Sequence, residues 1–214
     1  MAKIAEFFIE GGIWMVPIAF LSMVVVAVAV ERMYYLLFLY SEDGEELMNK
    51  VKRFVQSGQL DQAAKACDVK PTGILSRLVK KGLLLAEASP EEIKTGIEEA
   101  TFELVPLVQK RGNSLAGLAS LATLLGLLGT VMGLIEAFTV VADAPPDQKS
   151  VLLTKAISVA MNCTAFGLIV AIPAMFFQMM VGGAMKKVLD DVDTGSMKLE
   201  NWLVARRQGA KNVR

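Results

Sequence analysis

Two hydroxyl side chains stand inside long uncharged stretches of this sequence, where they are suited to hydrogen-bonding an ion or a proton carrier. Thr130 lies in the stretch 114–135 and Thr164 in the stretch 156–185, and each stretch is long enough to cross a bilayer. Lipid favours leucine at such depths, so these hydroxyls indicate helices that line something polar. Helix counting places both threonines at similar depth on antiparallel neighbours. The alternative is that each hydroxyl bonds the carbonyl one turn back in its own helix.

Other polar and small residues in these stretches predict close helix packing. Ser158 and Asn162 are four residues apart, and Asn162 is costly to bury alone, so we expect it to bond across a helix interface. Glycines spaced at four residues put small side chains on one helix face and allow backbones to approach closely. The residues predicted to pack the helices are Gly126, Gly129, Gly133 and Pro173.

Acidic residues near the ends of the apolar stretches are the other candidates for an ion path. Glu31 is followed by Arg32, and we interpret the two as an interfacial ion pair that also orients its helix toward a partner. Glu136 is either an acid that reaches back to the interface or a vestibule residue that attracts cations.

Several functional classes have no support in this composition. The chain has no histidine, and Cys67 and Cys163 are too far apart in sequence to indicate a metal site or a disulfide. The run GLLGTVMG lacks the Lys-Ser/Thr ending of a phosphate-binding loop and lies within an apolar stretch. We therefore expect neither an enzyme nor a cofactor or metal site.

The elements that must position these residues are membrane helices. Hydrophobic residues make up 54% of the 214 residues and the mean hydropathy is +0.48, too apolar for an ordinary soluble domain. A third apolar stretch follows residue 13, so the predicted fold is an all-α integral membrane protein with three transmembrane helices. The predicted segments are an amphipathic N-terminal segment 1–12, spans 13–40, 113–142 and 151–185, a cytoplasmic helical region 41–112, an outer loop 143–150 and a C-terminal helix and tail 186–214.

Basic residues set the expected orientation. Eleven of the 22 Lys and Arg residues lie in 41–113 and seven follow residue 185, which places these segments in the cytoplasm and the N-terminus outside. No cleavable signal peptide is expected, because acidic residues precede the first apolar stretch. Residues 3–10 are predicted to form an interfacial amphipathic helix, with a frayed terminus as the alternative.

The cytoplasmic region has a helical pattern. Amphipathic runs over 45–56, 60–67 and 73–86 predict three helices. Ser89, Pro90 and Glu92 then form a capping box that starts a longer helix, expected to run on into the second span with Pro106 as its one breaker. The third span is expected to continue into the cytoplasm, giving a helical bundle there. The acid-rich stretch 91–103 is either a solvated face or a surface for docking a partner.

Three motifs resemble one family, the ExbB/TolQ/MotA proton-channel family, and within it the ExbB/TolQ branch. GGIWMVPIAFLSMVVVAVAVER is similar to the first span of that family, LLGLLGTVMGLIEAF to the second and ISVAMNCTAFGLIVAIPAMFF to the third. The order and spacing of the motifs also match, so the resemblance covers nearly the whole chain.

The resemblance implies a motor subunit of the bacterial inner membrane. It implies a homopentamer around two copies of an ExbD/TolR/MotB-like single-span partner, whose membrane aspartate carries the proton, with Thr130 and Thr164 in the pore-facing ring. The coupling ion expected is the proton, with sodium left open. The driven process is Tol-Pal function, TonB-linked transport or gliding motility, and the resemblance does not choose among them.

One position departs from the family pattern. Many ExbB and TolQ members carry a glutamate five residues before the third-span threonine, and this chain has Val159 there. The alternative function is therefore a wall subunit of a mixed ring, in which a glutamate-bearing paralogue supplies the ion path.

Overall fold

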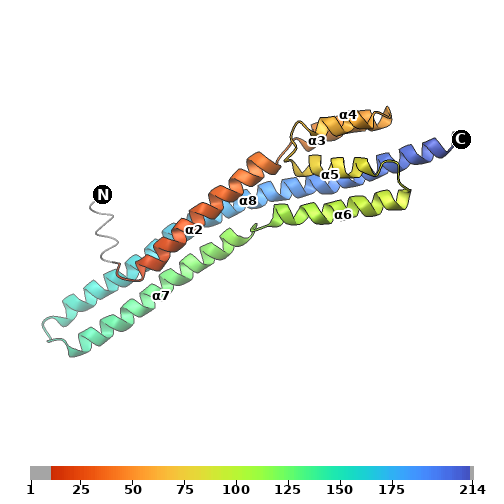
Figure 1. Ribbon diagram of the computed structural model, residues 1–214. Coiled ribbons are helices and arrows are strands. Elements are labelled where there is room, and N and C mark those ends of the chain that lie inside the picture. Colours follow the sequence, from red (N-terminus) through yellow and green to blue (C-terminus); the bar gives the residue numbers. More distant parts are fainter. Residues whose placement is uncertain (1–10, 213–214) are drawn as a thin grey trace. The chain divides into compact units, whose positions relative to one another are not determined.

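The computed structural model describes residues 11–212, and in this part of the chain the secondary structure consists of helices joined by short turns and loops, with no strand (Figure 1). The predicted amphipathic helix at residues 3–10 lies outside the described residues. The elements are α2 (Met15–Tyr34), the π-helix η1 (Tyr35–Tyr40), α3 (Gly44–Gln56), α4 (Leu60–Cys67), α5 (Ile74–Leu84), α6 (Pro90–Gln109), α7 (Ser114–Asp143) and α8 (Lys149–Asn212).

Three helical stretches of the described chain are long and apolar enough to cross a membrane, as predicted. They lie within Met15–Gln56, Pro90–Asp143 and Lys149–Gln208. The chain divides into two compact units, and each is described by itself. Unit 1 contains residues 11–31 and 113–180 of the described chain, and unit 2 contains residues 32–112 and 181–212.

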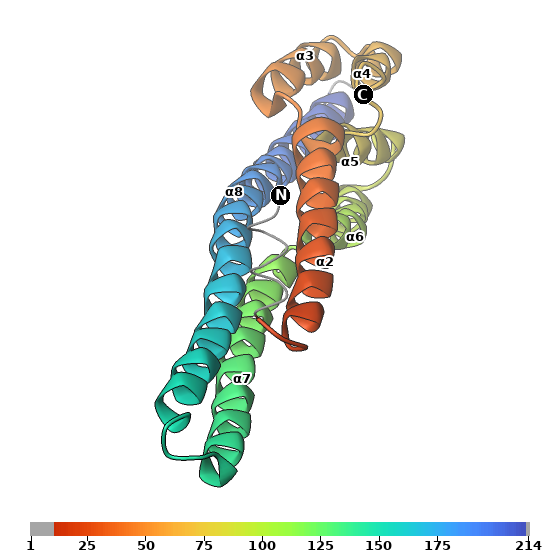
Figure 2. The same ribbon diagram turned by 90° about the vertical axis from the view of Figure 1, so that its left-hand side faces the viewer.

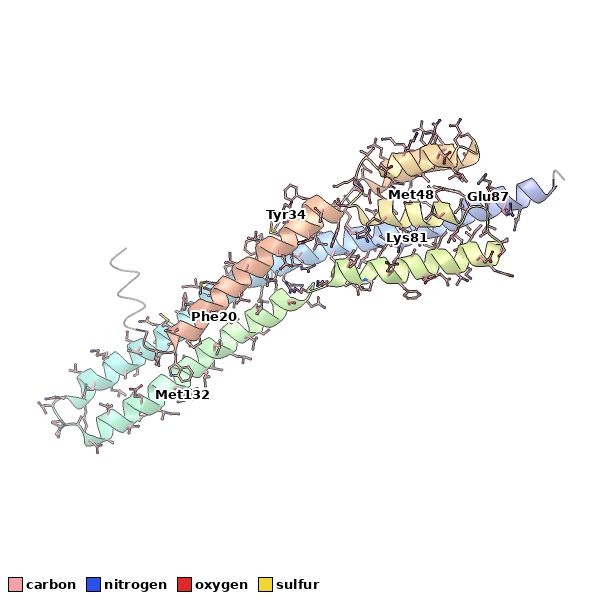
Figure 3. The ribbon with its side chains drawn as sticks, viewed as in Figure 1. Phe20, Tyr34, Met48, Lys81, Glu87 and Met132 are labelled. Atoms are coloured by element: carbon pink, nitrogen blue, oxygen red, sulfur yellow. The ribbon has the colours of Figure 1, made fainter. Side chains whose placement is uncertain are left out.

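Unit 1 is the part with exposed apolar helix faces. On α2 the buried side chains recur at helical spacing, as with Ile18, Val25 and Ala29, while Phe20 and Met23 on other faces are about two-thirds exposed (Figure 3). Soluble proteins rarely expose contiguous apolar surface of this kind. The faces of unit 1 therefore suit a lipid environment, and α7 and α8 run side by side within it (Figure 2).

Unit 2 contains the four helices α3 to α6, of which α3, α4 and α5 begin and end close to the predicted limits and α6 begins at the predicted residue. The Ser89 side chain accepts a hydrogen bond from the Glu92 amide, and Glu92 accepts one from the Ser89 amide at 2.8 Å, so the capping box is confirmed. Consecutive helices pack in the order α3, α4, α5, α6. In the C-terminal part of α8 the side chains of Leu199 and Leu203 are buried. The Leu199 side chain packs against Gly82 of α5 and fills the space that a Cβ atom there would occupy.

The expectation of one unbroken helix from residue 90 into the second span is wrong. Helix α6 includes Pro106 and ends at Gln109, and α7 begins at Ser114. Between them Lys110 has an extended ψ of 123° and Arg111 has a φ of 54°, in the left-handed region. The Gly112 amide donates to the Gln109 carbonyl, which closes a turn. Gly112 and Asn113 are turn-forming residues, so the break had a sequence signal that helix periodicity masked.

The thiol of Cys67 is inert in this fold. The side chain is buried in α4 and its Sγ donates weakly to the Ala63 carbonyl. Burial, and then the charges of Glu42 and Asp68, raise the pKa of this thiol to about 12, so the reactive thiolate is scarce at neutral pH.

One carboxyl group in unit 2 is expected to destabilise the fold at neutral pH. Asp191 of α8 is half-buried against Gly44, and burial raises its pKa, with the carboxylates of Asp190, Asp43 and Glu45 adding to the effect and Lys187 opposing it. Because the folded state holds the proton more tightly, the stability from this group is present at low pH and is lost as the pH rises through the folded pKa.

We therefore predict that Asp191→Asn raises the melting temperature of the detergent-solubilised protein at pH 7, and that this gain shrinks as the pH falls through the raised pKa of Asp191 and is lost below about 4. The measurement is thermal unfolding at several pH values. Asp190→Asn, at an exposed position on the same helix, is the matched control. An Asp191→Asn protein that melts lower than the parent at pH 7 would contradict the argument.

Candidate functional site

The centre of unit 1 is a crossing at which the backbones of α7 and α8 approach each other directly. A Cβ atom on Gly167 would lie 2.7 Å from the Ala122 carbonyl oxygen and 3.0 Å from the Gly126 Cα. A Cβ on Gly126 would lie 3.1 Å from the Cys163 carbonyl oxygen. These contacts are with backbone, which cannot rotate away as a side chain can. A larger residue at position 167 would therefore force the helices apart, and one at position 126 would make an unusually tight backbone contact.

The other two predicted glycines extend the same small-residue face along α7. A Cβ on Gly129 would lie 2.8 Å from the Cβ of Cys163 and 3.2 Å from that of Trp14. A Cβ on Gly133 would lie 3.3 Å from the Ala160 Cβ. The face of α7 that carries these glycines thus lies against α8, and against the residue that precedes α2.

The crossing brings Thr130 and Thr164 into contact. The Thr130 hydroxyl lies 3.1 Å from the carbonyl of Gly126, one turn back in its own helix, and 3.1 Å from the carbonyl of Ala160 on α8. The Thr164 hydroxyl lies 3.2 Å from the Gly126 carbonyl, and the two hydroxyl oxygens are hydrogen-bonded to each other. Ala160 is itself one turn before Thr164. The two hydroxyls and two carbonyls therefore form one hydrogen-bonded cluster.

This cluster differs from the other hydroxyls of α7. Thr123 donates to the Ala119 carbonyl at 3.2 Å and Thr139 to the Ile135 carbonyl at 2.8 Å, both in their own helix. Bonding within the helix, the alternative raised from sequence, thus accounts for these two threonines. For Thr130, bonding within the helix accounts for only one of its three hydrogen bonds. The Thr164 hydroxyl bonds a carbonyl of the other helix, that of Gly126 on α7.

The cluster has unused capacity to bind a ligand. Two hydroxyl hydrogens are shared among four oxygen acceptors, and each hydroxyl can rotate its hydrogen to a new acceptor. Both threonine side chains are half-buried, so each is accessible from one side. A protonated carboxyl group can donate to such an oxygen, and a carboxylate can accept from a rotated hydroxyl. The arrangement is therefore suited to a carboxyl group that alternates between its two charge states.

The remaining candidates in the spans lie apart from the bonds of this cluster. Asn162 is half-buried and Ser158 is exposed, and neither is among the hydrogen-bond partners described for the two threonines. Glu136 is exposed on α7, and Pro173 is exposed within α8. Val159 is half-buried, with its Cγ1 3.7 Å from the position of a Cβ on Gly12.

Glu31 and Arg32 fall at the division between the two units. Glu31 is half-buried, whereas the Arg32 side chain is 3% exposed and its guanidinium lies 6.0 Å from the centre of the Tyr35 ring. A cation over an aromatic face is a favourable contact for a buried arginine. The ion pair predicted between these two residues stays a prediction.

The sequence analysis did not identify Gly167 as a packing residue, nor the structural role of Cys163. The Sγ of Cys163 donates to the Gly11 carbonyl at 3.0 Å, which ties the segment before α2 to α8. Cys163 and Gly167 are four residues apart, so the small-residue spacing that identified the α7 glycines was present on α8 as well. No group of His, Cys, Asp and Glu able to hold a metal occurs in the part of the chain that the structure describes.

Comparison with known proteins places these features in a family. The model of the MotA/TolQ/ExbB proton channel family matches residues 70–194, which include both threonines and the helix crossing. The ExbB-like biopolymer transport protein 3 of Synechocystis sp. is 29% identical over 171 residues, which cover 78% of this chain and 79% of the relative. An ExbB homologue of Methanothermobacter thermautotrophicus is 22% identical over 93% of this chain and 70% of its own length. The ExbB of Aquifex aeolicus is 38% identical over 38% of this chain and 55% of its own length.

Proposed function

This chain belongs to the MotA/TolQ/ExbB proton channel family, and we propose that it is the ring-forming subunit of a motor that converts the proton-motive force into mechanical work. It is a multi-pass membrane protein and a channel subunit, not an enzyme. The observation that carries the proposal is the hydrogen-bonded pair of Thr130 and Thr164 at the glycine crossing. We place the protein in the bacterial inner membrane, with its N-terminus outside and unit 2 in the cytoplasm.

The proposed partner is a single-span protein with an aspartate inside the membrane, as in ExbD, TolR and MotB. Residues 149–186 of α8 contain no Asp or Glu, and Glu136 of α7 is exposed and is not among the hydrogen-bond partners described for the two threonines. A partner carboxylate would complete the site. An aspartate is expensive to keep charged in an apolar bore, and hydroxyls lower that cost by donating hydrogen bonds. Protonation of the aspartate then changes which contacts it prefers.

In a ring of equivalent subunits, a change in the contacts that the partner aspartate prefers can produce movement from one subunit to the next. We propose a pentamer of this chain around two partner copies, so that each protonation favours the threonine pair of the next subunit. One proton that crosses 100 mV releases about 2.3 kcal/mol, which biases a small step between equivalent sites without disrupting a packed helix interface. The proton is the proposed coupling ion.

The driven process is proposed from the names of the relatives. They are called biopolymer transport proteins of the ExbB type, which favours energisation of transport across the envelope, as in TonB-linked systems. Tol-Pal function and gliding motility are the other processes that a motor of this family would drive.

A second candidate function follows from Val159. The side chain at this position is apolar and half-buried, where many ExbB and TolQ members carry glutamate. If that carboxylate is indispensable to the ion path, this chain is instead a wall subunit of a mixed ring. A glutamate-bearing paralogue in the purified complex would identify this arrangement.

Proton flux in vesicles tests the proposal. We expect vesicles that contain this chain together with its single-span partner to take up protons when a potassium gradient and valinomycin impose an inside-negative potential. Vesicles with either protein alone are expected to show only the leak of protein-free vesicles. Flux that is unchanged when sodium is replaced by choline would identify the proton as the ion. Absence of flux from the joint complex would contradict a self-sufficient motor.

A further inference from the structure

A pocket lies between α3 and α8 within unit 2, whereas the threonine site belongs to unit 1. Its volume is about 290 Å³, and its lining residues are Glu45, Met48, Asn49, Lys52, Lys198 and Trp202. Cavities for whole small ligands usually measure about 300–1,000 Å³, so this one lies at the lower limit of that range and has room for one large side chain. Met48, labelled in Figure 3, is 4% exposed and supplies an apolar floor, with Trp202 beside it.

The rim of the pocket is basic on two sides. Lys52 of α3 and Lys198 of α8 are both exposed. Neither ammonium group has an ion-pair partner among the residues that the structure describes. The indole of Trp202 and the thioether of Met48 both favour contact with an aromatic ring, and the two lysines favour acidic groups next to that ring. Glu45 is the one acidic member of the lining.

Helix α6 carries an exposed aromatic ring with acidic residues beside it. Phe102 is 80% exposed at a position three or four residues after two exposed acids, Glu98 and Glu99, which therefore share its helix face. These acids also lack an ion-pair partner within the described part of the chain, whereas the neighbouring Glu103 is paired with Lys81 of α5. This face of α6 therefore has one exposed aromatic ring, and the two acids one turn before it are not in ion pairs.

The pocket and Phe102 are on separate helices at the two ends of the helix series in unit 2. The packing order is α3, α4, α5, α6, and both views place α3 and α6 at opposite edges of the unit (Figures 1 and 2). A contact between them must therefore join two copies. A membrane surface is the wrong partner for Phe102, because the anionic cytoplasmic leaflet repels Glu98 and Glu99.

We propose that Phe102 of one copy of this chain inserts into the pocket between α3 and α8 of the next copy, with Glu98 and Glu99 facing Lys52 and Lys198. The two surfaces of this contact are different patches of the same chain. Such head-to-tail contacts repeat around a ring when the rotation between copies closes. The contact deepens the proposed function, on which it rests for the existence of a ring, by assigning the cytoplasmic surfaces that join its subunits.

Site-specific photo-crosslinking tests where Phe102 lies. The full-length protein carries Phe102→p-benzoylphenylalanine and is irradiated in membranes from cells that express its partner. We expect a crosslinked dimer of this chain whose joined peptide contains residues 48–52 or 198–202. The matched control places the same amino acid at Val69, which is 86% exposed but has no pair of acids one turn before it, and is expected to give no such dimer. Crosslinks from Phe102 confined to lipid, to another protein or to the same copy would overturn the proposal.

A charge exchange tests the pairing of acids with lysines. Glu98→Lys with Glu99→Lys, and separately Lys52→Glu with Lys198→Glu, are each expected to lower the yield of the crosslinked dimer about tenfold, because like charges then meet. All four changes in one chain restore complementarity and are expected to restore the yield. These positions are exposed, so helix content is expected to stay unchanged. A fourfold variant that crosslinks no better than the twofold variants would overturn the proposal.

The outcomes of these experiments separate this contact from the proposed function. A protein that crosslinks as mapped but passes no protons in the vesicle assay would contradict the motor and keep the interface. A protein that passes protons without the mapped crosslink would keep the motor and contradict the interface.

Discussion

Replacing both clustered threonines by valine is expected to reduce proton flux about a hundredfold while the complex stays assembled. Thr130→Val with Thr164→Val keeps the shape of both side chains and removes both hydroxyls from the crossing. Each hydrogen bond to a charged group contributes about 1.5–3 kcal/mol, so the loss of two such bonds slows the passage of a partner carboxylate by about a factor of ten each or more. The measurement is the initial rate of proton uptake by vesicles that contain the variant and its partner.

The chain offers a matched control for this prediction. Thr139→Val and Thr123→Val remove hydroxyls that bond the carbonyl one turn back in α7, so they are expected to leave the flux near that of the parent protein. Assembly is checked by the native mass of each variant. Full flux in the double valine variant would remove the threonine pair from the mechanism.

Substitution of Gly167 is the second change with a large expected effect. In Gly167→Ala the new methyl group lies 2.7 Å from the Ala122 carbonyl oxygen and 3.0 Å from the Gly126 Cα, so the two helices must separate. Overpacking of this kind destabilises by about 1–3 kcal/mol. Separation of the helices also pulls Thr130 away from Thr164. We therefore expect both a lower melting temperature and a large loss of proton flux.

Gly117→Ala is the control, because a Cβ there meets no atom within 4 Å in the described structure. Alanine also favours helix over glycine by about 1 kcal/mol, so this control is expected to be neutral or stabilising. If Gly167→Ala melts and conducts like the parent protein, the close crossing is not what positions the threonines.

The sequence predicted the helices of this protein and its threonine pair, for physical reasons that act locally. Apolar length determines a span, and the capping box of Ser89 and Glu92 determines a helix start, without reference to distant residues. The prediction that Thr130 and Thr164 lie at similar depth required only helix rise and an antiparallel hairpin. Their hydrogen bond in the structure agrees with that geometry.

Features that depend on two distant segments were not predictable in this way. Gly167 looks like any glycine in an apolar helix until the Ala122 carbonyl is placed 2.7 Å from its missing Cβ. The break at 110–113 was overlooked because the flanking residues fit helix periodicity on both sides. For the acid-rich stretch 91–103, the sequence left a solvated face and a docking surface as alternatives, and the proposal of a docking surface rests on Phe102, which is 80% exposed.

The native mass of the detergent-solubilised complex, purified after co-expression with the aspartate-bearing single-span protein, tests whether this chain forms a ring around that partner. We expect a pentamer of this chain that retains two copies of the partner. A mixed ring with a glutamate-bearing paralogue would favour the wall-subunit function instead. A monomer or dimer of this chain without the partner would contradict the account of a proton-driven ring.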